Sequence, residues 1–399
     1  MVNNSAMFNA PDIKECRENL SNIIIAPFHD QKAKGIGYNL SASDLIYSLR
    51  KKSLLPIRYN DDGSYVFINP HDTVLMLSYE YIQSGDNVCG TFHSRVRNVA
   101  RGLGNVSTTL DPNWKGMLLI SLNNPTNRKI KLQITQNKDG KKERCSLLTL
   151  VVHRRDLSSE KTKKLSFHLD NPPMRADIWN ELIDKPHRFF RNKNYHIFQA
   201  FIGKLLDFKP VQNDRIKEFK EVLGIVLEME IASSANKCFE TLCSLMLELK
   251  QKASDDYIQL KDKINKLCDY IKKQKGTDLF STKGMKKTEE LIENIRNECK
   301  YLILCDEVEQ IHSFIHENVE RWWRFNSFLR IKNDYLFHII VSILISIILL
   351  LLFLFLPNLG DNNIYFKIII SMMPTICTFI LGFVSKMLKY TDVNKGKNN

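Results

Sequence analysis

The sequence of 399 residues lacks the motifs of several common enzyme classes. It has no P-loop, no Rossmann glycine pattern, no HExxH and no GxSxG, which excludes the sites those motifs build. None of its nine cysteines forms a CxxC pair, so the sequence argues against a zinc site or a disulfide framework and favours reduced thiols. The polar N-terminus also predicts that there is no signal peptide.

Acidic residues are fewer than basic ones. The chain has 57 Lys and Arg against 44 Asp and Glu, a formal net charge of +13 at pH 7. This excess permits nucleotides, nucleic acid or an anionic membrane surface as partners. No compact Lys/Arg stripe with interleaved aromatic residues is present, so we do not expect nucleic acid to be a partner. A membrane protein with basic flanks is the simplest explanation of the charge.

Two apolar runs near the C-terminus predict a transmembrane hairpin in a lipid bilayer. Tyr335–Leu356 has no Asp, Glu, Lys or Arg and is long enough to cross a bilayer as a helix. The second run, Ile364–Val384, contains Pro374, which membrane helices tolerate, and we place the second span at 364–388.

The charges that flank these runs predict their orientation. Basic residues precede the first run and follow the second: Arg321, Arg324, Arg330, Lys332, Lys386, Lys389, Lys395 and Lys397. The positive-inside rule then places both termini in the cytoplasm, with 389–399 as a cytosolic tail. We expect a multi-pass protein of the inner or cell membrane, with two spans.

The first 334 residues change pattern near 155–175. Before that point, β-branched and aromatic runs alternate with turn residues and predict a compact β-rich domain over 1–155. We expect a short helix at Asp12–Asn22. The predicted strands are Tyr65–Asn69, Thr73–Gln83, Met117–Asn123, Lys129–Ile134 and Ser146–His153.

Residues 156–334 have a helical pattern and form the predicted cytosolic helical region. Apolar residues recur at helical spacing in two stretches: Leu260, Ile264, Leu267 and Ile271, then Leu302, Val308, Ile311, Ile315, Val319 and Trp322. An intramolecular bundle explains such a stripe better than an oligomeric coiled coil does. The fold class is therefore an α+β multidomain chain: a β-rich domain, an all-α region and two transmembrane helices.

One helical histidine pair is a weak metal candidate. His312 and His316 are spaced i, i+4, and Glu309 and Glu317 lie nearby. A solvated helix face explains these residues better, so we predict no metal site.

Three blocks in the first 155 residues carry a family resemblance. They are the segments DIKECRENL, IIIAPF and GIGYNLSASDLIYSL within Asp12–Leu49; YVFINPHDTVLMLSYEYIQ; and FHSRVRNVARGLGNVSTTLDPNWKGMLLISLNN at Phe92–Asn124. In order and spacing they resemble the dCTP deaminase and dUTP pyrophosphatase superfamily. The resemblance implies a distorted β-barrel or jelly-roll domain, and a homotrimer with active sites between its subunits.

The third block supplies the nucleotide-binding candidates His93, Ser94, Arg95, Arg97, Asn98 and Arg101. We expect the first four of these residues to lie at the start of a short helix. Free N–H groups at a helix N-terminus suit phosphate, and arginine adds bidentate charge-assisted bonds. A solvated basic helix turn remains the alternative.

Asp111 is the catalytic candidate that the resemblance implies. The matching Asp lies beside the deoxyribose in the family, and in the pyrophosphatase members it helps to activate water. Ser107 and Thr108 match a strand whose backbone reads the pyrimidine edge. The alternative for Asp111 is a turn-forming residue before Pro112.

The block also departs from the family pattern. The deaminases use a Glu that moves protons between the attacking water and the leaving amine, and Ser121 stands at the aligned position. Asn98 replaces the second Arg of the GRSSxxR-like element, and Phe92-His93 replaces its opening Gly-Arg. We therefore expect binding of a deoxynucleoside triphosphate without deamination, through Arg95, Arg97 or Arg101.

Three hypotheses stay open. The first is a membrane-anchored nucleotide-binding sensor or effector, whose layout would suit bacterial defence or stress and whose triphosphate ligand can carry Mg²⁺. The second is an active, membrane-tethered dCTP deaminase or dUTP pyrophosphatase. The third is a protein-docking module without a ligand.

Overall fold

A computed structural model describes most of the chain. It describes residues 7–104, 108–138, 140–154, 175–184, 193–234, 239–254, 256–274, 279 and 281–355, with side chains as far as Trp323. Met1–Asn326 form one compact unit, and Ser327–Asn399 form a second. Most of the predicted boundary at 155–175, the second predicted span at 364–388 and the tail at 389–399 lie outside the described residues.

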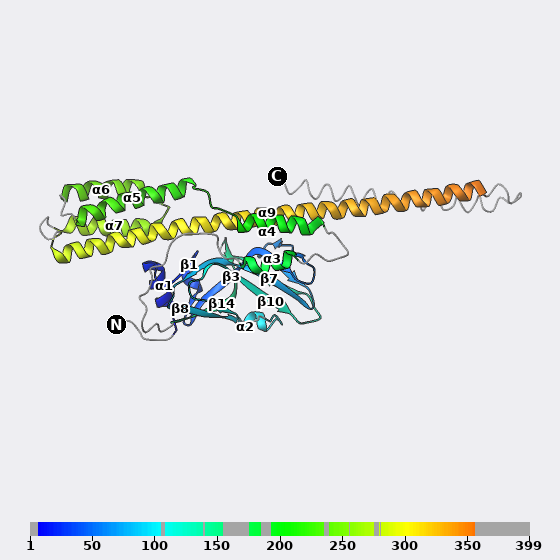
Figure 1. The fold of residues 1–399 in the computed structure, drawn as a ribbon, viewed down its shortest axis with the longest axis horizontal. Helices are drawn as coiled ribbons and strands as arrows, with labels where there is room; N and C mark the ends of the chain where they lie inside the picture. The colour runs from blue at the N-terminus through cyan, green and yellow to red at the C-terminus, as the bar shows by residue number, and fades with distance from the viewer. Residues whose placement is uncertain are drawn as a thin grey trace. The chain divides into compact units, whose positions relative to one another are not determined.

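Strands fill the first 154 residues, and helices follow (Figure 1). The strands are β1 (Ile23–Ala26), β2 (Ala33–Lys34), β3 (Gly37–Ser48), β4 (Ser53–Leu54), β5 (Arg58–Asn60), β6 (Gly63–Ile68), β7 (Asp72–Ser84), β8 (Val88–Ser94), β9 (Thr109–Leu110), β10 (Lys115–Asn124), β11 (Ile130–Gln133), β12 (Thr135–Lys138), β13 (Lys141–Arg144) and β14 (Ser146–Arg154). The helices are α1 (Ala10–Asn19), the 3₁₀ turn η1 (Asp30–Lys32), α2 (Val96–Val99), α3 (Ala176–Asp184), α4 (Lys193–Leu206), α5 (Asp214–Ser234), α6 (Phe239–Lys252), α7 (Ile258–Lys273) and α9 (Thr282–Phe355).

A capping box places the first helix slightly before its predicted position. The Asp12 amide donates to Asn9 Oδ1 at 3.0 Å, and the Asn9 amide donates to Asp12 Oδ2 at 2.9 Å. These bonds satisfy free N–H groups of the first turn, so α1 begins at Ala10. Leu20 adopts a left-handed conformation, which ends the helix before the predicted Asn22.

The β domain is built around β7. Nine strands of the described chain form the main sheet, in which β7 pairs with β1, β3 and β10, while β14 joins β3 to β8. The sheet encloses a core that includes Tyr38, Leu40, Met76 and Leu150. The strands predicted at β6, β7, β10, β11 and β14 are confirmed. β3 was not predicted, because its glycine and its small or polar residues Asn39, Ser41, Ser43 and Asp44 are not typical of a strand, although all twelve of its residues are buried.

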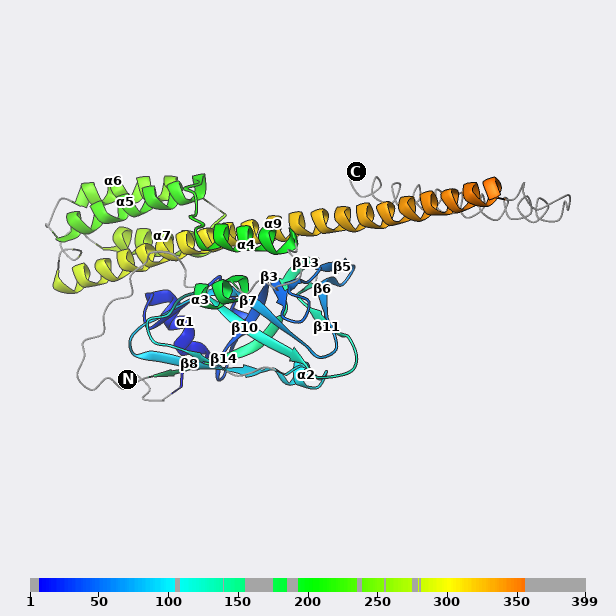
Figure 2. The same cartoon turned by 45° about the vertical axis from the view of Figure 1, so that its right-hand side comes forward.

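The helices that follow the β domain pack in two hydrophobic clusters. α5, α6, α7 and the first part of α9 share one cluster, which includes Leu260, Ile264 and Ile295. The next part of α9, from Leu304 to Trp322, packs against β-domain residues such as Leu45 and Leu77, and against α4 (Figures 1 and 2). The apolar stripe is therefore intramolecular, as predicted, but its second stretch covers the β domain.

α9 continues as one helix from Thr282 to Phe355, so its backbone includes most of the first predicted span at 335–356. Among the residues that the structure describes, no helix combines the length and the hydropathy that a membrane span needs.

Candidate functional site: a basic groove

An open groove of about 910 Å³ lies where α2 meets β11 and β13. Figure 2 shows α2, β11 and β13 at the same end of the β domain. Ten cationic side chains line it: Lys32, Lys34, Arg95, Arg97, Arg101, Arg128, Lys129, Lys131, Lys138 and Arg144. Only two lining residues, Asp62 and Glu143, carry a carboxylate. Such an excess of one charge concentrates field lines in the groove and favours an anionic ligand.

The wall that contains α2 is held by hydrogen bonds to β14. Arg95 precedes the helix, and its Nη1 donates to the Ser146 carbonyl at 3.1 Å. Asn98 is buried, and its Nδ2 donates to the Leu147 carbonyl at 2.8 Å. Arg97 and Arg101 on the same turn are exposed. Asn98 therefore fixes the turn from which these two arginines extend.

The prediction that His93 and Ser94 begin a helix is wrong. Both residues lie in β8, because that strand stays paired with β14 as far as Ser94. His93 Nε2 lies 3.0 Å from Thr91 Oγ1, and neither His93 nor Ser94 is among the groove residues. α2 has four residues, which is too short for a helix dipole to contribute much.

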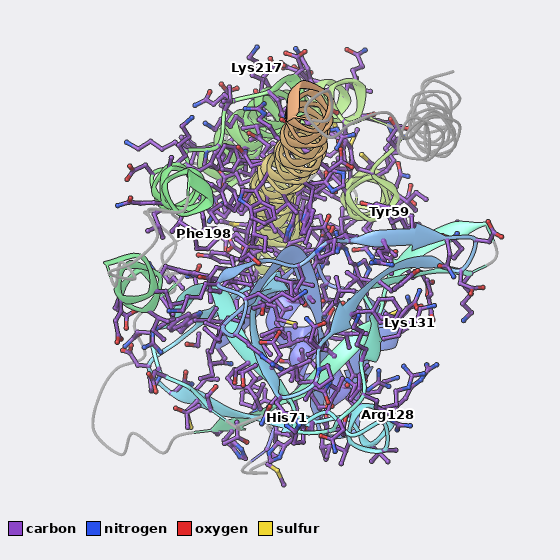
Figure 3. All side chains as sticks on the ribbon, turned by 90° about the vertical axis from the view of Figure 1, so that its right-hand side faces the viewer. Tyr59, His71, Arg128, Lys131, Phe198 and Lys217 are labelled. Carbon is purple, nitrogen blue, oxygen red and sulfur yellow. The ribbon has the colours of Figure 1, made fainter. Side chains whose placement is uncertain are left out.

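The opposite wall was not predicted. In β11, Ile130 and Leu132 are buried while Lys131 is exposed and extends its Nζ to 4.2 Å from the centre of the Tyr65 ring. Figure 3 shows Lys131 and Arg128 on the same side of the β domain. The alternation in Lys129–Leu132 indicates a half-buried strand with a basic outer face. Nothing in the sequence indicates that this face lies opposite α2.

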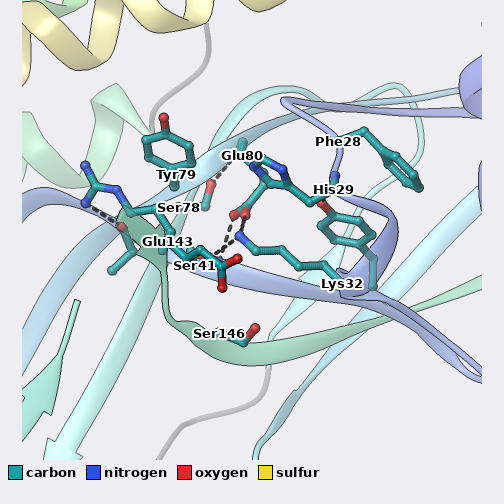
Figure 4. A network of polar contacts seen from close by, with 12 residues as sticks. Phe28, His29, Lys32, Ser41, Ser78, Tyr79, Glu80, Glu143 and Ser146 are labelled. Carbon is teal, nitrogen blue, oxygen red and sulfur yellow. Dashed lines mark hydrogen bonds and ion pairs between the residues drawn. The ribbon is translucent and has the colours of Figure 1, made fainter. Parts of the chain in front are cut away.

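Two of the lining cations already have carboxylate partners. The Lys32 ammonium lies 2.8 Å from Glu80 and 2.6 Å from Ser41 Oγ, and all three residues are buried (Figure 4). Arg144 donates from Nη1 to Asp44 Oδ1 at 2.6 Å. Within the described part of the chain, Arg97, Arg101 and Arg128 have no carboxylate partner. The groove therefore keeps unneutralised charge.

The remaining candidates that the structure describes lie away from the groove. None of the lining residues is Thr108, Asp111 or Ser121, and Ser107 lies outside the described residues. β9 pairs with β8 at Gly90 and Thr91, which separates Asp111 from Arg95 by roughly 20 Å of strand. A single subunit therefore does not bring the catalytic candidate and the arginines together.

Asp111 stabilises its own turn. Its carbonyl accepts a bond from Ser84 Oγ at 2.9 Å, and its carboxylate accepts a longer one from Thr109 Oγ1 at 3.4 Å. The Trp114 amide donates to the same Ser84 hydroxyl at 2.9 Å.

Ser121 lies in β10 opposite Leu75. Over the residues the structure describes, no three His, Cys, Asp or Glu side chains gather closely enough to hold a metal ion.

The predicted histidine pair contacts the β domain, with His312 buried and His316 partly exposed. His316 Nδ1 donates to Asp44 Oδ2 at 2.8 Å, and this bond raises the pKa of His316. Burial opposes the charge of Asp44, but His316 and Arg144 outweigh that effect and hold the carboxyl pKa well below its usual range.

His312 lies one turn earlier and is buried. Its Nε2 donates to the Tyr79 carbonyl at 2.6 Å, and its ring stacks on Tyr79 at 4.0 Å. Burial, with a smaller contribution from the Arg144 charge, lowers the pKa of His312 to about 4. The expected solvated face is therefore an interface between α9 and the β domain.

Comparisons with known proteins identify this domain. No protein-family model matches the chain. A dCTP deaminase from Thermococcus kodakarensis is 30% identical over 123 residues, which are 31% of this chain and 74% of that protein.

Solved structures with lower identity also match. The native EIAV dUTPase is 16% identical over 35% of this chain and 92% of its own, with a TM-score of 0.23. A 2′-deoxycytidine 5′-triphosphate deaminase from Agrobacterium tumefaciens is 12% identical over 38% of this chain and 49% of its own, with a TM-score of 0.28. On the sequence match to the Thermococcus protein, the chain belongs to the dCTP deaminase family through its N-terminal β domain.

Proposed function

We propose that the chain binds a deoxynucleoside triphosphate, with the phosphates in the basic groove, and does not deaminate it. The observation that carries this proposal is the set of ten groove cations opposed by two carboxylates. Three of these cations, Arg95, Arg97 and Arg101, come from the block that resembles the nucleotide-binding segment of the family. Arginine binds phosphate oxygens through two parallel N–H bonds, which gives both strength and orientation.

The absence of a proton carrier supports binding without deamination. Ser121 stands where the family has its Glu, and no Asp or Glu occurs between Asp111 and Asp139. A serine hydroxyl does not hold and release a proton near neutral pH as a tuned carboxylate does. Mg²⁺ would reach this site on the triphosphate, since it commonly binds through phosphate oxygens and few protein ligands.

Assembly and membrane attachment complete the proposal. A homotrimer, which the family resemblance implies, would bring three basic grooves into one assembly. The runs at 335–356 and 364–388 would anchor the trimer in a bilayer with both termini in the cytoplasm. In that arrangement the protein would act as a membrane-bound sensor or effector of deoxynucleotides, in a role such as bacterial defence or stress.

Calorimetric titration of the full-length protein with dCTP, dUTP and the other deoxynucleoside triphosphates tests the proposal. We expect micromolar or tighter binding of at least one triphosphate, weakening steeply as salt rises. No heat and no thermal stabilisation with any of them would contradict it and favour the docking-module hypothesis.

A further inference from the structure

We propose that Arg144 transmits occupancy of the basic groove to helix α9 by exchanging its partner Asp44 for a bound phosphate. This inference rests on the proposed function of the groove. It concerns a residue that no sequence pattern singled out.

Arg144 belongs to two environments. It lies at the end of β13 and lines the groove, with 19% of its side chain exposed. Its Nη1 donates to Asp44 Oδ1 at 2.6 Å and to the Ala42 carbonyl at 3.3 Å. Its guanidinium carbon lies 4.6 Å from the centre of the Tyr79 ring. One guanidinium therefore contacts the groove, a carboxylate and an aromatic face.

Asp44 and Tyr79, which contact Arg144, both contact α9 as well. Asp44 uses its second oxygen to accept the bond from His316, and Tyr79 stacks on His312 and accepts its N–H. The two histidines are one helical turn apart, so they face the same side of α9. Arg144 thus touches both β-domain residues that hydrogen-bond to these two histidines.

A phosphate is a better partner for Arg144 than Asp44 is. Only Nη1 is bonded to Asp44, and Nε and Nη2 have no hydrogen-bond partner among the described residues. A phosphate can accept two parallel bonds from the fork of the guanidinium, which the single Asp44 contact does not use. Lys32, the other paired groove cation, is bonded to Glu80 inside the barrel and has no described contact with α9.

The exchange weakens the attachment of α9. Asp44 is 8% exposed, so losing Arg144 leaves a buried carboxylate with the His316 N–H as its remaining side-chain partner. Leaving a buried charge partly unpaired is costly, and Tyr79 also loses its cation–π contact. Linkage makes the effect reciprocal: conditions that free Arg144 from Asp44 must tighten phosphate binding.

The test combines calorimetry with hydrogen exchange on the full-length protein in detergent micelles, using dCTP and inorganic tripolyphosphate as probes. We expect saturating ligand to speed amide exchange in peptides over 304–322 by about five-fold, the lower end of typical coupling. Peptides over α7 should not change. Asp44→Asn should bind both probes at least five-fold more tightly than the unmodified protein.

Two variants serve as controls. Glu143→Gln also removes one negative charge, from a groove residue with no described contact with α9, so it should tighten binding less than Asp44→Asn and leave the exchange response intact. Arg144→Lys keeps the charge but loses the two parallel N–H donors of the guanidinium. Ligand should therefore still bind, but it should no longer speed amide exchange over 304–322. This comparison decides the question even if Asp44→Asn does not fold.

The possible failures are distinguishable. If neither probe binds the unmodified protein, the proposed function fails, and the inference fails with it. If a probe binds but exchange over 304–322 stays constant, or Arg144→Lys responds like the unmodified protein, the inference is overturned while the binding proposal stands.

Discussion

The α2 turn of the groove and the Asp111–Ser121 region both lie within Phe92–Asn124 but have different chemistry. At the groove, α2 places Arg97 and Arg101 opposite the basic face of β11, with few carboxylates nearby. At β9 and β10, Asp111 bonds within its own turn, and Ser121, which the family resemblance aligns with the proton carrier, lies in β10 opposite Leu75. On the proposed function, phosphate binding and proton transfer would depend on separate residues, so one could persist without the other.

The groove also differs in its connection to the rest of the chain. Arg144 links it to α9 through Asp44 and Tyr79, whereas the bonds described for Asp111 stay within neighbouring strands and turns. A ligand in the groove could therefore affect the helical region, even if no reaction takes place.

Charge reversal in the groove should have the largest effect. Arg97→Glu with Arg101→Glu removes two charge-assisted phosphate contacts, each worth about 1.5–3 kcal/mol. We expect the Kd for dCTP to rise about 1,000-fold, measured by calorimetry. Lys204→Glu with Lys209→Glu makes the same charge change on exposed residues outside the groove and should leave binding nearly unchanged. Equal losses in both double variants would mean that only overall charge matters.

Acidification should weaken the contact between α9 and the β domain at His312. Between pH 6.5 and about 4 the unfolded chain protonates its histidine while buried His312 stays neutral, so the free energy of unfolding should fall as pH falls. The difference between the pKa of His312 in the folded and in the unfolded chain corresponds to about 3 kcal/mol of unfolding free energy. His316 does not cause this loss, since its raised pKa favours the folded state below pH 6.5.

Denaturant unfolding across this pH range measures the loss. His312→Gln keeps an N–H donor for the Tyr79 carbonyl but does not titrate, so the slope between pH 6.5 and 4 should become much smaller. An unchanged slope would show that other groups control the acid sensitivity.

Neutralising Asp111 should have the smallest effect on binding. Asp111→Asn keeps the turn geometry and lies away from the groove, so we expect the Kd for dCTP to change by less than about two-fold, within the energy of one weak hydrogen bond. A large loss of affinity would indicate that Asp111 from another subunit completes the nucleotide site.

The sequence predicted the parts whose signals are local. Strand alternation in β6, β7 and β10 and helical spacing in α7 identified those elements, and the basic turn identified Arg95, Arg97 and Arg101. It did not predict that Lys131 and Arg144 lie opposite this turn, because their positions depend on how β11 and β13 fold back. The environment of His312 and His316 was also missed, since a solvated histidine and one packed on Tyr79 look the same in a sequence.

Product analysis tests the central claim most directly. The full-length protein is incubated with dCTP and with dUTP in the presence of Mg²⁺, and the nucleotides are separated and quantified by mass spectrometry beside a calorimetric binding measurement. We predict saturable binding with both nucleotides recovered unchanged. Conversion of dCTP to dUTP, or of dUTP to dUMP and pyrophosphate, would contradict the account and establish an active enzyme.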